Sequence, residues 1–151
     1  MVCLSLLIEG GVAIGDETAM PEKPLVIDIM GSEYRWHYRY PGPDETLGTA
    51  DDIRRLGDLH LSMGTPVVLQ LKSEDYIYTF KLPHIDRVKM AVPEIVFTLE
   101  FTPDSLGTFE LEGDQMCGFS HESLKAKLIV ETQEDFATWL VGKDQTDANS
   151  R

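Results

Sequence analysis

A cysteine and a histidine stand four residues apart in one glycine-containing turn. Cys117 and His121 belong to the segment Gln115-Met116-Cys117-Gly118-Phe119-Ser120-His121. A thiolate sulfur and an imidazole nitrogen in one loop can bind a single soft or borderline metal ion. The simpler interpretation is a buried thiol beside an ordinary loop histidine. The elements around the turn must therefore decide between the two.

Alternation of β-branched and aromatic residues with polar residues predicts strands on both sides of this turn. The expected strands are 25–30, 34–40, 67–71, 76–82, 95–101, 108–111 and 124–131. The range 133–141 is expected to form a short helix with Thr132 as its N-cap, because Asp135 follows three residues later. The pattern predicts an all-β domain that ends in one helix.

Composition indicates one acidic domain. The chain has 151 residues, 42% of them hydrophobic, which suits one core rather than two. Lys and Arg number 13 against 26 Asp and Glu, and the formal net charge of -13 argues against nucleic acid as a partner. Such a charge could attract a basic protein or simply keep the domain soluble. The acidic stretch 44–58 is expected to be a solvated loop rather than a calcium site.

Three regions are expected along the chain. Residues 1–23 are interpreted as a linker or remnant segment, because the apolar stretch 1–8 is interrupted by Glu9 and is too short to cross a bilayer. The same stretch has no positive leading region and is not a convincing signal peptide. Residues 24–141 form the expected domain, and 142–151 a disordered polar tail.

Several motifs, in the order in which they follow along the chain, resemble the soluble domain of cytochrome c oxidase subunit II. They are Gly31-Ser32-Glu33-Tyr34-Arg35-Trp36-His37-Tyr38-Arg39-Tyr40-Pro41-Gly42, Leu59-His60-Leu61-Ser62-Met63-Gly64-Thr65-Pro66-Val67, Asp75-Tyr76-Ile77-Tyr78-Thr79-Phe80, Arg87-Val88-Lys89-Met90-Ala91-Val92-Pro93, the Cys117 loop and Val130-Glu131-Thr132-Gln133-Glu134-Asp135-Phe136. The resemblance implies a cupredoxin-like Greek-key β-barrel or sandwich on the extracytoplasmic, periplasmic side of a respiratory membrane. In functional members a binuclear copper centre, copper A, passes electrons from cytochrome c to the haem of subunit I.

The chain departs from the family's metal motif, which reads Cys-x-Glu-x-Cys-Gly-x-x-His-x-x-Met with a further histidine on an earlier strand. Gly113 stands at the first cysteine, Gln115 at the glutamate, Leu124 at the methionine and Tyr78 at the strand histidine. Cys117 and His121 remain. A binuclear centre needs two bridging thiolates, so the sequence predicts that copper A is not formed and that any copper is a single ion.

A single copper ion held by Cys117 and His121 needs further donors. By the resemblance, Gln115 could offer its backbone carbonyl. Tyr78 or His84 could supply an extra donor, although a core aromatic and an ordinary loop residue are the simpler interpretations of these two. Tyr34 occupies the place of the family's electron-entry tryptophan, and Trp36, two residues on, is expected in the core.

Three hypotheses stay open. The chain is an electron-transfer domain with one copper ion, a metal-free structural subunit of a haem-copper oxidase as in quinol oxidases, or a protein that delivers Cu(I). The resemblance implies subunit I and a basic cytochrome c as partners, with membrane association through partners or upstream helices. The chain has no catalytic machinery of its own, so any oxidase activity would belong to the complex.

Overall fold

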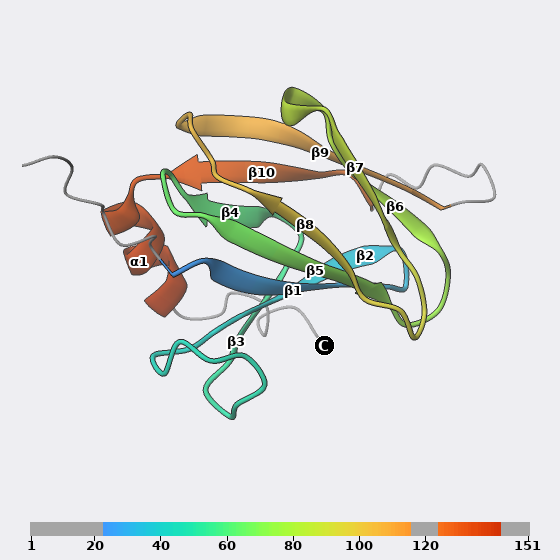
Figure 1. Ribbon diagram of the computed structural model, residues 1–151, viewed down its shortest axis with the longest axis horizontal. Coiled ribbons are helices and arrows are strands. Elements are labelled where there is room, and N and C mark those ends of the chain that lie inside the picture. Colours follow the sequence, from blue (N-terminus) through green and yellow to red (C-terminus); the bar gives the residue numbers. More distant parts are fainter. Residues whose placement is uncertain (1–22, 116–123, 143–151) are drawn as a thin grey trace, which may run out of the picture.

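The computed structural model describes residues 23–115 and 124–142, which form a sandwich of two five-stranded sheets (Figure 1). The first sheet has the strand order β3 (Ile53–Leu56), β2 (Arg35–Tyr40), β1 (Leu25–Ser32), β5 (Val67–Ser73), β8 (Phe97–Phe101). The second has the order β4 (Leu59–Ser62), β10 (Ala126–Glu131), β9 (Gly107–Gln115), β6 (Tyr78–Leu82), β7 (Arg87–Ala91). A short 3₁₀ helix, η1 (Pro83–Ile85), follows β6, and the helix α1 (Gln133–Val141) follows β10. The predicted all-β cupredoxin-like fold with one short helix is confirmed.

The core lies between the sheets because the strands alternate buried and half-buried residues. Strand β5 shows this most regularly, with every second side chain from Val67 to Ser73 buried. Two ladders, β1 with β5 and β4 with β10, are parallel, and the other ladders are antiparallel. Large buried aromatic side chains come from two strands, β2 and β6: Trp36, Tyr38, Tyr40, Tyr78 and Phe80.

Helix α1 begins and ends where the sequence predicts. Thr132 is its N-cap, and its Oγ1 accepts a hydrogen bond of 3.1 Å from the backbone N–H of Asp135. In Figure 1 the helix lies at one end of the sandwich, while the β1–β2 turn and the start of β6 lie at the other. Trp139 of α1 stacks on His60 of β4 with ring centroids 3.9 Å apart, so His60 packs the helix against the second sheet.

Strands β4 and β7 were not predicted, and two expectations about the first sheet are wrong. Tyr34 does not begin a strand: Glu33 (φ 50°) and Tyr34 (φ 60°) form the two-residue turn between β1 and β2, and β2 begins at Arg35. The stretch 44–58 is not all loop, because Ile53–Leu56 pairs with β2 as the edge strand β3. Arg55 of β3 lies over the ring of Trp139, 5.1 Å from its centroid, and donates to the carbonyl oxygens of Leu140 and Gly142.

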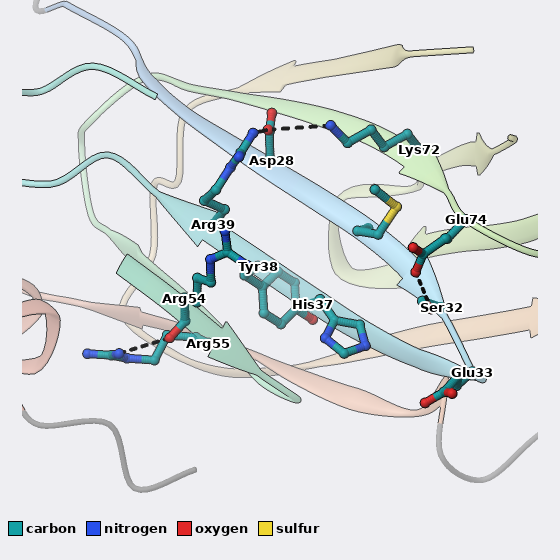
Figure 2. Close-up of a pocket in the computed structure, with 11 residues that line it drawn as sticks. Asp28, Ser32, Glu33, His37, Tyr38, Arg39, Arg54, Arg55, Lys72 and Glu74 are labelled. Carbon is teal, nitrogen blue, oxygen red and sulfur yellow. Dashed lines mark hydrogen bonds and ion pairs between the residues drawn. The ribbon is translucent and has the colours of Figure 1, made fainter. Parts of the chain in front are cut away.

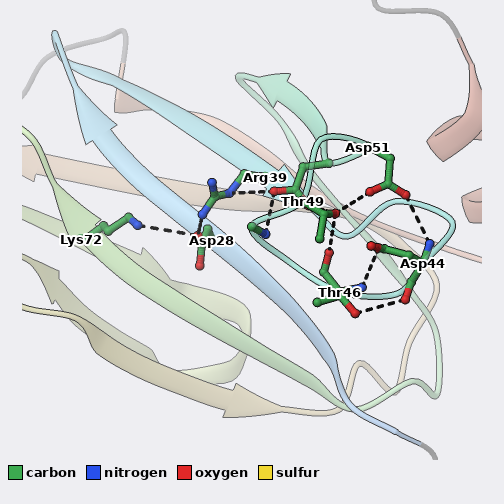
Figure 3. Close-up of polar contacts among 9 residues, drawn as sticks. Asp28, Arg39, Asp44, Thr46, Thr49, Asp51 and Lys72 are labelled. Atoms are coloured by element: carbon green, nitrogen blue, oxygen red, sulfur yellow. Dashed lines mark hydrogen bonds and ion pairs between the residues drawn. The ribbon is translucent and has the colours of Figure 1, made fainter.

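The rest of that stretch is a loop held together by its own side chains (Figure 3). Asp44 accepts a hydrogen bond of 2.9 Å from the backbone N–H of Thr46, and Asp52 accepts one of 2.8 Å from that of Gly48. Asp52 also forms an ion pair of 3.4 Å with Arg39 of β2. The carboxylates therefore order the loop and fasten it to the first sheet. Among residues 23–115 and 124–142, no helix is long and apolar enough to cross a bilayer.

Candidate metal centre

The ladder between β6 and β9 brings together three of the positions where the family motif has ligands or a ligand carbonyl. Tyr78 stands opposite Gln115, and Phe80 stands opposite Gly113. Cys117 and His121 lie outside the described residues, so their roles as ligands stay predictions. The structure therefore describes the strand side of the candidate site, together with Leu124.

Tyr78 is fully buried and its hydroxyl is already used. The hydroxyl donates a hydrogen bond of 2.7 Å to Oδ1 of Asp75 and accepts one of 3.3 Å from the backbone N–H of Tyr34. Burial, together with the hydrogen bond to Asp75, raises the pKa of Tyr78 well above its ordinary value. The side chain is thus held as a neutral phenol, which is a poor metal ligand. Its burial agrees with the interpretation as a core aromatic.

The space beside Gly113 is filled by Trp36, which is 1% exposed, as expected of a core residue. A Cβ atom at position 113 would lie 2.9 Å from the backbone oxygen of Leu124 and 2.9 Å from both Cζ2 and Nε1 of the Trp36 indole. The indole N–H in turn donates a hydrogen bond of 3.0 Å to that oxygen of Leu124. A cysteine side chain at this position would therefore overlap atoms that are packed and hydrogen-bonded to one another.

His84 lies near the other end of strand β9. Its ring stacks on Phe109, with centroids 4.2 Å apart and an interplanar angle of 14°. Phe109 precedes Gln115 by six residues, which at the rise of a strand separates them by about 20 Å. Burial lowers the pKa of His84, with Asp104 acting in the opposite direction. The structure thus does not bring His84 together with Tyr78 or Gln115, and this geometry argues against it as a third donor.

Tyr34 lies at the surface end of a group of aromatic rings. It stacks on Tyr76 with centroids 5.5 Å apart, and both rings meet the edge or face of Tyr78, at 6.2 and 6.3 Å. The Tyr78 ring contacts Trp36 at 5.8 Å, and Trp36 contacts Phe80 at 5.2 Å. Aromatic contact therefore runs from Tyr76, which is 47% exposed, to the buried indole.

Asp75 and Tyr76 belong to this site although the sequence analysis gave them no role. The carboxylate of Asp75 accepts three hydrogen bonds, from the Tyr78 hydroxyl and from the backbone N–H groups of Glu33 and Tyr76, the last two at 2.8 Å each. It therefore joins the β1–β2 turn to the segment before β6. The sequence signal that could have predicted the role of Asp75 is a carboxylate three residues before a tyrosine that is expected to be buried.

A hollow of about 480 Å³ lies on the outer face of the first sheet (Figure 2). Asp28 lies between two cations there, paired with Arg39 and at 3.6 Å from the Nζ of Lys72. Arg54 and Glu74 also line it. Charges of both signs are mixed on this face, so the overall acidity of the chain does not make it a docking face for a basic protein.

The described residues do not fit the binuclear centre. The first cysteine is a glycine whose neighbouring space is filled, the strand histidine is a hydrogen-bonded neutral phenol, and the methionine is Leu124, fully buried, whose side chain is not a ligand. Within residues 23–115 and 124–142, no three His, Cys, Asp or Glu side chains come together in an arrangement that could hold a metal ion.

The two-sheet arrangement with the ligand positions at one end defines a cupredoxin-like domain. The periplasmic domain of subunit II of cytochrome oxidase from Bradyrhizobium japonicum has the same fold, with a TM-score of 0.66 and 20% identity over 80% of this chain and 94% of that domain. The chain is similar in sequence to cytochrome c oxidase subunit II. It matches no protein-family model.

Curated relatives carry the sequence similarity. The chain is 32% identical to the alternative cytochrome c oxidase subunit 2 of Bradyrhizobium diazoefficiens, over 90% of this chain and 57% of that protein. It is 30% identical to cytochrome c oxidase subunit 2 of Thermostichus vulcanus, over 87% and 37%. A probable quinol oxidase subunit 2 of Staphylococcus epidermidis is 27% identical, over 93% and 36%. The chain thus spans only about a third to just over half of these relatives.

Proposed function

We propose that this chain is a subunit II-like domain of a haem-copper oxidase that docks on subunit I without assembling a binuclear copper centre. Its place would be the extracytoplasmic face of a respiratory membrane. The similarity to subunit II of cytochrome c oxidases and of a quinol oxidase supports the assignment to such a complex. Any oxidase activity belongs to that complex.

One observation supports the loss of copper A most strongly. Three of the family's ligand positions, now Gly113, Leu124 and Tyr78, are all in contact with Trp36. The Trp36 ring fills the space beside Gly113 and contacts the ring of Tyr78, and its indole N–H donates a hydrogen bond to the backbone oxygen of Leu124. A metal ion at these positions would have to displace buried aromatic packing and break hydrogen bonds. The domain is expected to be stable without the ion.

The exposed edge of the aromatic group suggests how a partner would be met. The stacked rings of Tyr34 and Tyr76 offer an aromatic surface, and three exposed acidic residues, Glu33, Glu74 and Asp75, are their neighbours along the chain. An aromatic surface with acidic residues nearby suits a basic partner such as cytochrome c, which the net negative charge would steer towards the domain at low salt. This keeps Tyr34 as the proposed contact point for an electron donor.

A second candidate is a single copper ion held by Cys117 and His121, with the backbone carbonyl of Gln115 as a further donor. Retention of a thiol and an imidazole four residues apart favours it, and Gln115, the last residue of β9, precedes Cys117 by two residues. The hydrogen bonds of the Tyr78 hydroxyl and the stacking of His84 on Phe109 argue against either of them as the third strong donor. A two-ligand site of this kind suits Cu(I) better than Cu(II), which would fit copper delivery.

Copper titration of the full chain separates these states. The expected result is no intense thiolate-to-Cu(II) absorption band and no binuclear stoichiometry. A band that disappears in Cys117→Ala would instead support a single electron-transfer copper, and tight Cu(I) binding without a Cu(II) chromophore would support delivery. Association is tested by tagging the chain and asking whether subunit I of a haem-copper oxidase is retained; purification free of any oxidase subunit would contradict the proposed function.

A further inference from the structure

The residues at the family's ligand positions also connect separate segments of the chain. Tyr78 connects three segments at this end of the sandwich: its own strand β6, the segment of Asp75 before it, and the β1–β2 turn at Tyr34. A metal bound by side chains from several segments would hold the same end of a domain together. Here hydrogen bonds and aromatic contacts among protein groups connect them.

The turn between β1 and β2 depends on this connection. Glu33 and Tyr34 both have left-handed backbone angles, which are unfavourable for residues with side chains. The N–H of Glu33 donates to Asp75 at 2.8 Å and the N–H of Tyr34 donates to the Tyr78 hydroxyl at 3.3 Å. A further hydrogen bond of 2.8 Å joins Ser32 to Glu74. Asp75, which precedes β6, and Tyr78, its first residue, therefore supply acceptors for both residues.

A glycine at position 31 leaves space for the ring of Tyr78, whose hydroxyl accepts the hydrogen bond from Tyr34. A Cβ atom at Gly31 would lie 2.5 Å from Cδ2 and 2.9 Å from Cε2 of Tyr78. A glycine at position 31 and a tyrosine at position 78 are thus matched in size, in the same way that Gly113 is matched to Trp36.

We propose that Asp75, Tyr78 and Trp36 form an aromatic clasp that replaces the metal as the group holding the β1–β2 turn, the start of β6 and the segment at Leu124 together. With the clasp formed, this end of the domain reaches its native arrangement without copper. The inference deepens the proposed function and rests on it only for the identity of the ligand positions.

Amide hydrogen exchange of the isolated, metal-free chain tests the clasp, with Tyr78→Phe and Asp75→Asn as variants. Tyr40→Phe is the matched control, since Tyr40 is also fully buried and its hydroxyl likewise accepts from a backbone N–H, that of His60 at 3.0 Å, and donates to a carbonyl. Tyr40 belongs to the α1 end of the sandwich, where its ring contacts Trp139.

Four results are expected, one for each chain. In the wild-type chain without metal, the amides of Glu33, Tyr34 and Tyr76 exchange slowly, and copper does not change their rates. Tyr78→Phe speeds exchange at Tyr34 about tenfold and leaves His60 unchanged, since one lost hydrogen bond changes a local opening equilibrium by about this factor. Tyr40→Phe gives the opposite pattern, and Asp75→Asn speeds exchange at Glu33 and Tyr76.

Two results would overturn the clasp. One is wild-type amides at Glu33, Tyr34 and Tyr76 that exchange as in an unstructured peptide until copper is added. The other is Tyr78→Phe and Asp75→Asn chains with unchanged rates at these amides. If Tyr78→Phe does not fold, the comparison with and without copper and the Asp75→Asn variant still decide. Failure to associate with subunit I would refute the proposed function and leave these rates unaffected.

Discussion

Replacing Gly113 by alanine tests whether the vacant cysteine position is closed. The new Cβ would lie 2.9 Å from the Leu124 oxygen and from two atoms of the Trp36 indole, about 0.6 Å or more inside ordinary contact between such atoms. The indole is 1% exposed and cannot turn aside. Overpacking of this kind costs about 1–3 kcal/mol. The lower freedom of alanine in the unfolded chain offsets about 0.4–1 kcal/mol. We therefore expect a net loss of about 1–2 kcal/mol.

Equilibrium denaturation in metal-free buffer measures this loss. The cause is identified by a double-mutant cycle with Trp36→Phe, because phenylalanine lacks the two indole atoms that the Cβ would meet. In that background Gly113→Ala is expected to cost at least about 0.5 kcal/mol less, as for residues in direct contact. Glu110→Ala, at an exposed position of the same strand, is the control and is expected to stay within about 0.5 kcal/mol of wild type.

The closed space at position 113 is refuted if Gly113→Ala is as stable as wild type, or if its cost is the same with tryptophan and with phenylalanine at position 36. Either result would mean that the space at position 113 is open to a side chain. Gly113→Cys meets the same atoms with one more, larger sulfur atom behind the Cβ. Restoring the family's cysteine alone is therefore expected to destabilise the domain and not to restore a binuclear centre.

Three further predictions concern neighbouring contacts. Gly31→Ala places a Cβ 2.5 Å from the ring of Tyr78, so it should destabilise at least as much as Gly113→Ala, by about 2–3 kcal/mol in denaturant titration; an equal midpoint to wild type would contradict it. Partial burial raises the pKa of Asp75, but its hydrogen bonds from Tyr78 and two backbone N–H groups outweigh this and lower the pKa. A lowered folded-state pKa gives stability that is present above pH of about 4 and lost as pH falls towards the folded-state pKa, so Asp75→Asn should flatten this part of a pH–stability curve, and an unchanged acid slope would refute it. Thr132→Ala removes the N-cap of α1 and should cost about 1 kcal/mol, whereas Thr132→Ser should keep most of it.

Local patterns predicted much of the fold. Alternation of buried and polar residues marks β5, and the capping residue marks α1, because these signals are contained within a few neighbouring positions. Strand β3 could not be found in this way, since Ile53–Leu56 contains two arginines and follows an acidic loop; its pairing with β2 and the contact of Arg55 with Trp139 are long-range. The turn at Glu33 and Tyr34 lacks the Asn-Gly signal of such turns and depends on acceptors from a segment 42 and 44 residues away.

The candidate site was predictable only in its residue types. The sequence indicates that Tyr78 and Trp36 are core residues and that the family's ligands are replaced, and burial bears out the first of these. It does not indicate that Asp75 accepts the hydrogen bond of the Tyr78 hydroxyl, although the two residues are only three positions apart. Nor does it indicate that two glycines make room for two rings, because those contacts join segments distant in sequence. Whether His84 could serve as a metal donor depends on which part of β9 it lies against. No local sequence pattern predicts that position.

The substitutions at this end of the domain depend on one another. Gly113 is needed beside Trp36, and Gly31 is needed beside Tyr78, since a Cβ at either glycine would overlap the ring that it faces. Tyr78 in turn needs Asp75, because a buried hydroxyl without an acceptor would cost about 1–3 kcal/mol. Restoring one ligand, as in Gly113→Cys or Tyr78→His, therefore disrupts the packing of Trp36 or Tyr78. It adds only one of the several donors that a metal site needs. Metal binding at this end of the domain is expected only if the ligand positions are replaced together and Trp36 is changed as well. The ladder between β6 and β9 would hold the backbone of these positions in place with or without the metal.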